Sequence, residues 1–396
     1  MGQTLSEPVT EKESAHCQND EFAVGSSCMQ GYRIHMEDSH THILSLPDDP
    51  GTSFFAVYDG HGGANIGKYA SKHLHKFVTK RSEYQTDVPS AMKNAFLDID
   101  EALLNAEELK HEMGGSTAVV TLIKDKKLYC ANAGDSRAIA CVNGQAIALS
   151  VDHKPILPVE MQRIHESGGW VENCRVNGSL ALSRALGDFK FKQNKKLKAE
   201  RQIVTAYPDV EIHDIDETWD FVLLASDGIW DVLTNDEVVK MCLKKMERGL
   251  PPEEICEEIM TECLSPDLLM TGTDNMTIVL ICFLHNKPYE DFCKRAAEYC
   301  KRLFLDDDKT TGKKYSPLSE EKHPDDDYDF DSGDEEDMHA DGEHNGIEDK
   351  EANDSNGVAE NGVTENGKKG VDAESVQDIV QESKKFKEIE DETEPK

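Results

Sequence analysis

The sequence predicts an α+β fold in which antiparallel β-sheets are layered with helices. The first observation is a group of apolar segments, VVTLIKD, KLYCANAG and SRAIACV, which follow one another between residues 119 and 142 with turns of hairpin length. The second is that segments with apolar residues at helical spacing come in long pairs between groups of strands. Hairpin spacing favours antiparallel pairing over a doubly wound parallel sheet, so a layered α+β architecture is expected.

The individual elements support this class in chain order. The apolar runs SFFAVY (53–58) and DFVLLA (220–225) predict buried strands, and an Asp-Gly pair follows each of them closely. A third apolar run, NMTIVLICFL (275–284), predicts another buried strand. Helices are predicted over 64–80, over 88–109, after an Asn235 cap, from Pro251-Pro252 onward, and over 289–304.

Composition divides the chain into three parts. Residues 1–19 are an N-terminal segment, 20–305 hold the strand and helix patterns of one domain, and 306–396 are a tail with 31 acidic residues against 11 lysines. The tail has few apolar residues, so it cannot bury enough surface to offset the cost of ordering and is expected to be disordered. The whole chain carries a net charge of −35, which argues against nucleic acid as a partner because phosphate backbones bind Lys and Arg.

Cysteine usage and the N-terminus bear on location. Eleven scattered cysteines without a CxxC pair indicate reduced thiols and a cytoplasmic protein, with the nucleus or a transient membrane association as further locations. The first residues, MGQTLS, match the N-myristoylation pattern with Gly2 as the acceptor, although a plain N-terminus fits them equally well. One acyl chain gives only reversible membrane contact. No apolar run reaches the length of a membrane span, and a monomer is expected.

Acidic residues recur at the ends of predicted strands and in the adjacent turns. The set consists of Glu37, Asp38, Asp59, Asp135, Asp227, Asp231 and Asp274. Each one alone is an ordinary turn residue, since Asp-Gly is a common turn. If the set converges in the fold, its members repel one another unless cations lie between them. All the candidate ligands are oxygens, so the expected ions are Mn²⁺ or Mg²⁺ rather than structural Zn²⁺.

Two hard cations held by carboxylates suit the hydrolysis of a phosphate ester, because they activate water and clamp the attacking and leaving oxygens. His61 lies two residues after Asp59 and is placed to protonate a leaving alkoxide, with a structural turn histidine as the alternative. The guanidinium of Arg33 matches phosphate oxygens, and its alternative is a salt bridge to Glu37 or Asp38.

Eight motifs along the chain carry a resemblance to a known family. They are SSCMQGYRIHMEDSH, FFAVYDGHGG, GGSTAVV, NAGDSRA, DHKP, RVNGSLALSRALGD, LLASDGIWD and GTDNMTIVL. In this order, over residues 20–285, they resemble the metal-dependent serine/threonine protein phosphatases of the 2C type. The resemblance implies a central sandwich of two antiparallel β-sheets flanked by helices on both sides. It also implies two Mn²⁺ or Mg²⁺ ions, with a weaker third.

The resemblance further implies roles for particular residues. Direct ligation falls to Asp59, which bridges both ions, and to the Gly60 carbonyl, Asp227 and Asp274. Glu37 and Asp38 hold metal-bound waters or ligate directly, while Asp135 and Asp231 match acids of the third ion. His61 matches the general acid, Arg33 the phosphate contact, and Thr117 and Asn275 polar positions near the site. The implied reaction is direct attack of a metal-bridging hydroxide on phosphoserine and phosphothreonine in proteins.

Three matters stay open at this point: the branch of the family, the role of a lysine-rich segment, and the functional class. MGQTLS, NKKLKAERQIVTAYPDV and the acidic stretch bring the chain near the metazoan alpha and gamma branches of the family. The lysine-rich segment 189–202 either steers acidic phosphoproteins, the expected partners, to the enzyme or is a solvated loop. Two functional classes other than a protein phosphatase also stay open. One is a metal-dependent phosphoesterase that acts on small molecules, and the other is a non-enzymatic docking protein that works through its acidic tail.

Overall fold

The fold is built on two antiparallel sheets, as the sequence predicts. The computed structural model describes residues 4–109, 112–268 and 270–304. The six-stranded sheet contains, in spatial order, β1 (Thr4–Gln18), β2 (Phe22–Arg33), β16 (Met276–Phe283), β15 (Trp219–Ala225), β9 (Arg137–Val142) and β10 (Gln145–Ala148). The five-stranded sheet contains β14 (Asp209–Asp214), β8 (Lys127–Ala133), β7 (Ala118–Lys124), β4 (Ser53–Tyr58) and β3 (Ser39–Ile43).

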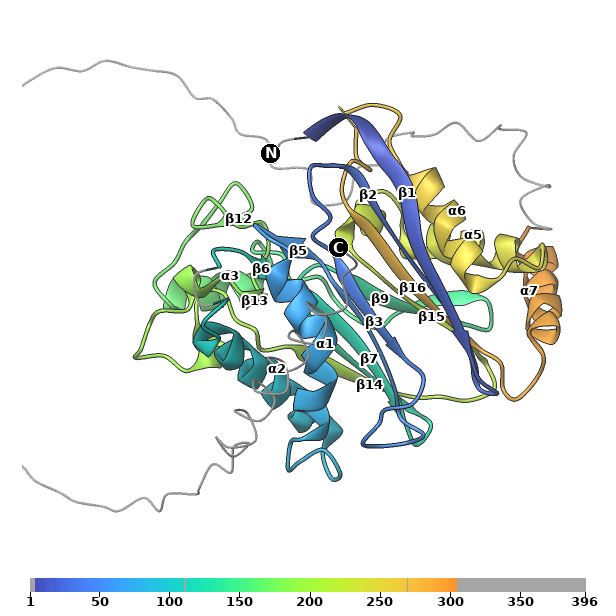
Figure 1. Ribbon diagram of the computed structural model, residues 1–396, viewed down its shortest axis with the longest axis horizontal. Coiled ribbons are helices and arrows are strands. Elements are labelled where there is room, and N and C mark those ends of the chain that lie inside the picture. Colours follow the sequence, from blue (N-terminus) through green and yellow to red (C-terminus); the bar gives the residue numbers. More distant parts are fainter. Residues whose placement is uncertain (1–3, 110–111, 269, 305–396) are drawn as a thin grey trace, which may run out of the picture. The chain divides into compact units, whose positions relative to one another are not determined.

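Helices cover the outer face of each sheet (Figure 1). The five-stranded sheet packs on α1 (Asn65–Thr79) and α2 (Val88–Asn105), and the six-stranded sheet on α5 (Asn235–Glu247), α6 (Pro252–Cys263) and α7 (Tyr289–Phe304). Alternate residues of one strand enter different cores: Ile278 and Leu280 face the helices, while Val279 and Ile281 face the other sheet. This period of two is what a strand buried on both faces requires. The predicted sandwich with helices on both outer sides is confirmed.

Smaller elements connect and flank the sandwich. A three-stranded sheet joins β13 (Leu186–Gly187), β6 (Gly115–Ser116) and β5 (Gly60–His61), and a hairpin joins β11 (Val171–Glu172) to β12 (Arg175–Val176). Helices α3 (Pro158–Glu166) and α4 (Asp227–Trp230) and two 3₁₀ turns (Phe189–Phe191 and Ala199–Arg201) complete the described chain. The element α4 matters for the site because it begins at Asp227 itself.

The prediction of three successive hairpin-linked strands between 119 and 142 is only half right. β7 and β8 form the expected hairpin, and its turn residues Asp125 and Lys126 have φ of 52° and 58°, as a tight type I′ turn requires. β9, however, leaves this sheet and pairs with β15 and β10 in the other one. The short turn between β8 and β9 therefore crosses between the sheets, and it carries Asp135 across their shared end.

Strand β1 occupies most of the predicted N-terminal segment 1–19 and pairs with β2 across the boundary placed between residues 19 and 20. Its residues pair antiparallel with β2 from Thr4 to Gln18. β1 is an edge strand whose side chains are nearly all exposed or half-buried, so it lacks the apolar alternation that would predict it. Contacts to α6 hold it: His16 hydrogen-bonds to Glu253 (2.8 Å), and the Ser14 hydroxyl donates to Glu257 (2.6 Å).

Two helix ends differ from prediction. The cap of α5 is Thr234 rather than Asn235, because a capping box forms: the Glu237 N–H donates to the Thr234 hydroxyl and the Glu237 carboxylate accepts from the Thr234 N–H (2.9 Å). Helix α2 ends at Asn105 rather than Leu109, since Ala106 is extended. The predicted tail, 306–396, lies outside the described residues. Within the described ranges no helix has the length and apolar character to cross a membrane, and all eleven cysteines are free thiols.

Candidate metal centre

Strand register brings the candidate acids to one end of each sheet. In the six-stranded sheet, Ala225 pairs with both Arg137 and Ile278, so the residues just beyond these positions, Asp227, Asp135 and Asp274, share one edge. In the five-stranded sheet, Ser39 pairs with Tyr58, so their neighbours Asp38 and Asp59 share the corresponding edge. Segments up to about 240 residues apart in sequence thus present carboxylates from the same end of the sandwich.

The carboxylates influence one another across the two sheets. Burial raises the pKa of Asp59 well above its ordinary value, and the charges of Asp227, Asp38 and Asp135 raise it further. Burial likewise raises the pKa of Asp227, with the charge of Asp135 as the next cause. The pKa of Asp231 is raised by burial too, although the ammonium of Lys154 opposes the shift. Five or more acids therefore face a common space in which their ionised forms repel one another.

Asp38 is the candidate ligand whose buried carboxylate lacks hydrogen-bond partners. Its side chain is 6% exposed, and neither carboxylate oxygen makes a hydrogen bond with a described residue. Burial raises its pKa, while the nearby hydroxyls of Thr277 and Ser226 favour the ionised form. A buried carboxylate without partners is costly unless a proton or a cation compensates it. Oxygen donors of this kind fit Mg²⁺ or Mn²⁺.

Hydrogen bonds from two polar side chains hold the loops that carry the candidate acids. The Thr117 hydroxyl accepts from the Asp59 N–H (3.0 Å) and shares a hydrogen bond with Ser136 (2.7 Å), which ties the ends of β4, β7 and β9 together. The Asn275 side chain accepts from the Glu37 N–H (2.9 Å) and donates to the Gln30 and His35 carbonyls. Both polar positions singled out in the sequence therefore hold the backbone of the candidate ligands.

Gly60 follows Asp59 because no side chain fits there. A Cβ at this position would lie 2.4 Å from the Glu37 carbonyl oxygen, so the two loops approach each other only with glycine present. This approach keeps Glu37 beside Asp59.

His61 is held by a carboxylate that sequence reasoning did not assign. The Asp188 Oδ2 lies 2.6 Å from His61 Nε2, and Asp188 is 2% exposed. Burial disfavours the imidazolium, but the hydrogen bond and charge of Asp188 outweigh it and raise the pKa of His61. Asp188 has a φ of 51°, in the left-handed region, and a Cβ on Gly115 would lie 2.4 Å from its Oδ2. Such backbone strain beside a titratable pair is typical of functional sites.

Two basic side chains contact the acidic cluster. Arg33 donates to the Asp274 carboxylate, not to Glu37 or Asp38 as the alternative had it, and the side chain is 41% exposed. Lys154 donates to Asp135 (2.7 Å), and although burial acts against the ammonium, Asp135 raises the pKa of Lys154. Lys154 lies in DHKP and Asp188 in RALGD, so both were within quoted motifs. No local sequence pattern indicated that Lys154 would pair with Asp135, or Asp188 with His61.

The carboxylates lie near one another, but they are not close enough to form a complete set of metal ligands. Among the described residues, no three His, Cys, Asp or Glu side chains converge closely enough to count as a ready-made metal site. The mutual pKa effects nevertheless place Asp59 among Asp227, Asp38, Asp135 and Asp274. The observations that fit hard divalent ions are therefore the oxygen-donor chemistry and the two Asp38 oxygens without hydrogen-bond partners.

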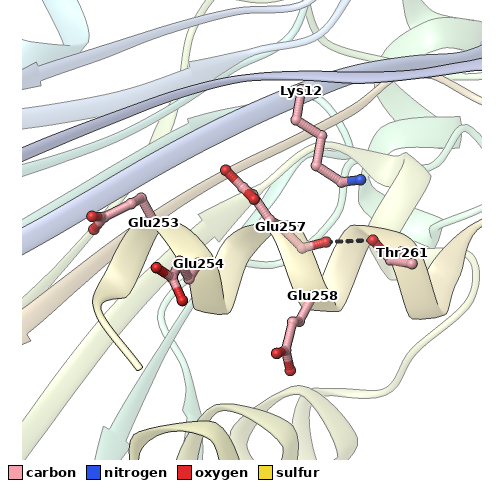
Figure 2. Close-up of a pocket in the computed structure, with 6 residues that line it drawn as sticks. All are labelled: Lys12, Glu253, Glu254, Glu257, Glu258 and Thr261. Carbon is pink, nitrogen blue, oxygen red and sulfur yellow. Dashed lines mark hydrogen bonds between the residues drawn. The ribbon is translucent and has the colours of Figure 1, made fainter. Parts of the chain in front are cut away.

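A separate cavity of about 470 Å³ lies between β1 and α6 (Figure 2). It is lined by Lys12, Glu253, Glu254, Glu257, Glu258 and Thr261. None of these is a candidate ligand or catalytic residue. Glu253, Glu257 and Glu258 also have partners of their own in His16, Ser14 and Lys245. The cavity is therefore part of the packing of β1 on α6.

Comparison with known proteins shows the family to which the chain is similar. The model of the protein phosphatase 2C family matches residues 22–268. A probable protein phosphatase 2C of Caenorhabditis elegans is 54% identical over 290 residues, covering 72% of this chain and 82% of the relative. Protein phosphatase 2C homolog 3 of Schizosaccharomyces pombe is 45% identical over 305 residues, covering 75% and 73%. A phosphatase structure from Toxoplasma gondii is 27% identical with a TM-score of 0.61, covering 70% and 96%. The chain belongs to the protein phosphatase 2C family.

Proposed function

We propose that the acids at the end of the sandwich hold two divalent cations, Mn²⁺ or Mg²⁺, with which this metal-dependent phosphatase hydrolyses phosphoserine and phosphothreonine in proteins. The direct ligands would be Asp59, the Gly60 carbonyl, Asp227 and Asp274. Glu37 and Asp38 would hold ligated waters or bind directly, and Asp135 and Asp231 would serve a weaker third ion. The observation that carries this assignment is the convergence of mutually repelling carboxylates, among them a buried Asp38 without partners.

The bound ions would supply positive charge and lower the pKa of the attacking water. Side chains of the protein supply the proton for the leaving group and the contact to the phosphate. Asp188 holds the Nε2 edge of His61, so the proton offered to the leaving serine or threonine oxygen is carried on Nδ1. Arg33 uses one nitrogen on Asp274 and keeps other N–H donors for phosphate oxygens. Its 41% exposure leaves the guanidinium open to substrate.

Comparing substrate classes tests this function. Purified protein with Mn²⁺ should turn over phosphoserine and phosphothreonine peptides, and a chelator should abolish the activity. Faster turnover of a nucleotide than of any phosphopeptide would favour the small-molecule phosphoesterase. Absence of turnover with every substrate, with Mn²⁺ or Mg²⁺ supplied, would favour the docking protein.

Replacing Asp188 by Asn should slow phosphopeptide hydrolysis by about 10- to 100-fold. Without the Asp188 charge, His61 is a less well oriented and less protonated acid, and general acids contribute on the order of 10²–10⁴. Asn tolerates the left-handed φ, so the fold should survive. Turnover of p-nitrophenyl phosphate should change little, because its leaving group needs no proton. An equal loss on both substrates would count against His61 as the acid, and Asp214→Asn, in the exposed Lys127 pair, is the control.

We further propose a monomeric cytoplasmic protein with access to the nucleus, whose Gly2 is myristoylated and mediates transient membrane contact. Free cysteines and the MGQTLS pattern support these points. The same pattern and NKKLKAERQIVTAYPDV support a place near the metazoan alpha and gamma branches. Mass spectrometry of the mature N-terminus from cells decides the acylation, and an unmodified glycine would reject it.

A further inference from the structure

Lys154 supplies a positive charge to the acids that the proposed function assigns to a third ion. Its ammonium donates to Asp135 Oδ2 over 2.7 Å, and the side chain of Asp135 is 4% exposed. Although burial acts against the ammonium, the charge and hydrogen bond of Asp135 raise the pKa of Lys154, and the charges of Asp231 and Asp227 raise it further. The ammonium therefore lies among the same acids that would hold the ion.

The backbone beside Lys154 is tied to the turn that carries Asp135. The His153 N–H donates to the Gly134 carbonyl (2.9 Å), and the Gly134 N–H donates to His153 Nδ1 (3.2 Å). The N–H and the hydroxyl of Ser183 both donate to the His153 carbonyl, over 3.0 and 2.9 Å. The residues that precede Lys154 and Asp135 are thus bound to each other, so the flexible stem of the lysine begins beside its partner.

The Lys154 ammonium can leave its partner, whereas the other cation near these acids is fixed. Arg137 also acts on Asp231 and Asp135 through its charge. Its guanidinium, however, donates twice to Asp152 (2.9 and 2.8 Å) and once to Asn235 (2.9 Å). The Lys154 side chain is 38% exposed and ends in a compact charge on a stem of four carbons. Only this lysine can exchange its carboxylate partner for water without breaking a network.

An ammonium and a divalent ion compete for the same carboxylate oxygens. Mg²⁺ binds oxygens at about 2.0–2.1 Å and would repel an ammonium in hydrogen-bond contact with the same carboxylate. We propose that Lys154 occupies the place of the third ion beside Asp135 and Asp231, and that it must swing into solvent before the ion binds. This inference rests on the proposed function and deepens it, because breaking a charge-assisted hydrogen bond gives a physical reason for a weak third site.

Calorimetric titration of the full-length protein with Mn²⁺ tests the exchange without requiring activity. The variant Lys154→Met keeps an unbranched stem without the charge, and it should bind the weakest ion about tenfold more tightly than the original. Lys154→Arg retains the charge and should bind that ion much as the original does. Asp135→Asn should lose the weakest binding phase, which identifies it. Lys127→Met is the matched control, because Lys127 pairs with Asp214 at the opposite end of β8, is 44% exposed and should leave every Mn²⁺ affinity unchanged.

Thermal unfolding gives a second readout, which separates ion exchange from a structural role. In chelator, Lys154→Met leaves Asp135 and Asp231 without their ammonium, so the variant should unfold at a lower temperature than the original. Saturating Mn²⁺ should remove or reverse this difference, because the ion then supplies the positive charge in both proteins and binds the variant more tightly. A structural lysine would cost the same stability in both conditions.

The outcomes distinguish this inference from the proposed function. Lys154→Gln, a second neutral variant, should repeat the results of Lys154→Met. An unchanged or weaker affinity for the weakest ion in both neutral variants, with the tighter ions still bound, would overturn the inference alone, because Lys154 would then only orient Asp135. An equal loss of stability with and without Mn²⁺ would also overturn it. Absence of Mn²⁺ binding to the original protein would overturn the proposed metal centre as well.

Discussion

Replacing Asp59 by Asn should abolish phosphatase activity while leaving the metal-free fold at least as stable as the original. The activity loss is expected to be on the order of 10²–10³ or more, as for removal of one preorganised charge-stabilising group. Stability should not fall, because Asp59 faces the charges of Asp227, Asp38 and Asp135, which raise its pKa in the folded protein. A neutral side chain of the same shape relieves that repulsion.

Thermal unfolding with and without Mn²⁺ is the deciding measurement. In chelator, the Asp59→Asn variant should unfold at the same or a higher temperature than the original. When Mn²⁺ is added, the original should gain stability through binding to the folded state, and the variant should gain much less. Glu211→Gln, at an exposed position of β14, should behave like the original in both conditions. Equal Mn²⁺ shifts for the two proteins, or full activity of the variant, would remove Asp59 from the metal centre.

Much of this arrangement follows from local sequence, and the exceptions have a common cause. The strands of the core were predictable because runs such as SFFAVY and TIVLICF are apolar on both faces, as a strand between a sheet and a helix layer must be. Edge strand β1 was not, since its side chains are mostly exposed and its pairing with β2 is determined by β2 and α6. The crossing of β9 into the second sheet also depends on long-range pairing with β15, which hairpin spacing cannot reveal.

In the candidate site, too, some features were predictable from the sequence and others were not. Residue types at strand ends predicted a set of oxygen ligands, because the chemistry of hard cations limits the choice of side chains. Pairings across the fold were not predictable: Asp188 meets His61 across 127 positions, and Asp274 meets Arg33 across 241. Each such contact depends on the register of several strands. The sequence therefore indicates which chemical groups are present, while the fold determines which of them form hydrogen bonds or ion pairs with one another.

Replacing Glu160 by Ala should destabilise the protein by about 3 kcal/mol, the largest stability effect expected of a single charged side chain here. Glu160 is 2% exposed and accepts from Arg163 (2.6 Å), Arg184 (2.6 Å) and Ser183 (2.5 Å). Its removal leaves two buried guanidiniums without their shared carboxylate. Arg163 would keep carbonyl partners and Arg184 would keep Asp209, so the lower end of the usual range of about 3–5 kcal/mol applies. The matched control is Glu166→Gln, which removes an exposed ion pair of the same helix and should cost under about 1 kcal/mol.

Acid unfolding gives this prediction a second, independent measurement. Burial alone would raise the pKa of Glu160, but the hydrogen bond from Arg184 and the charges of Arg163 and Arg184 lower it to about 2, against an ordinary value of 4.5. A lowered folded-state pKa means that the stabilisation is fully present above pH 4.5 and is lost as pH falls from there towards 2. The difference corresponds to about 3 kcal/mol, so the original should lose that much more stability over this interval than the Glu160→Ala variant. Denaturant titrations at about pH 7, 4.5 and 3 measure it, and about 2 kcal/mol of the difference should be lost by pH 3. Parallel losses in the two proteins would show that Glu160 is not ionised in the fold, and its ion pairs with Arg163 and Arg184 would then not be what stabilises α3.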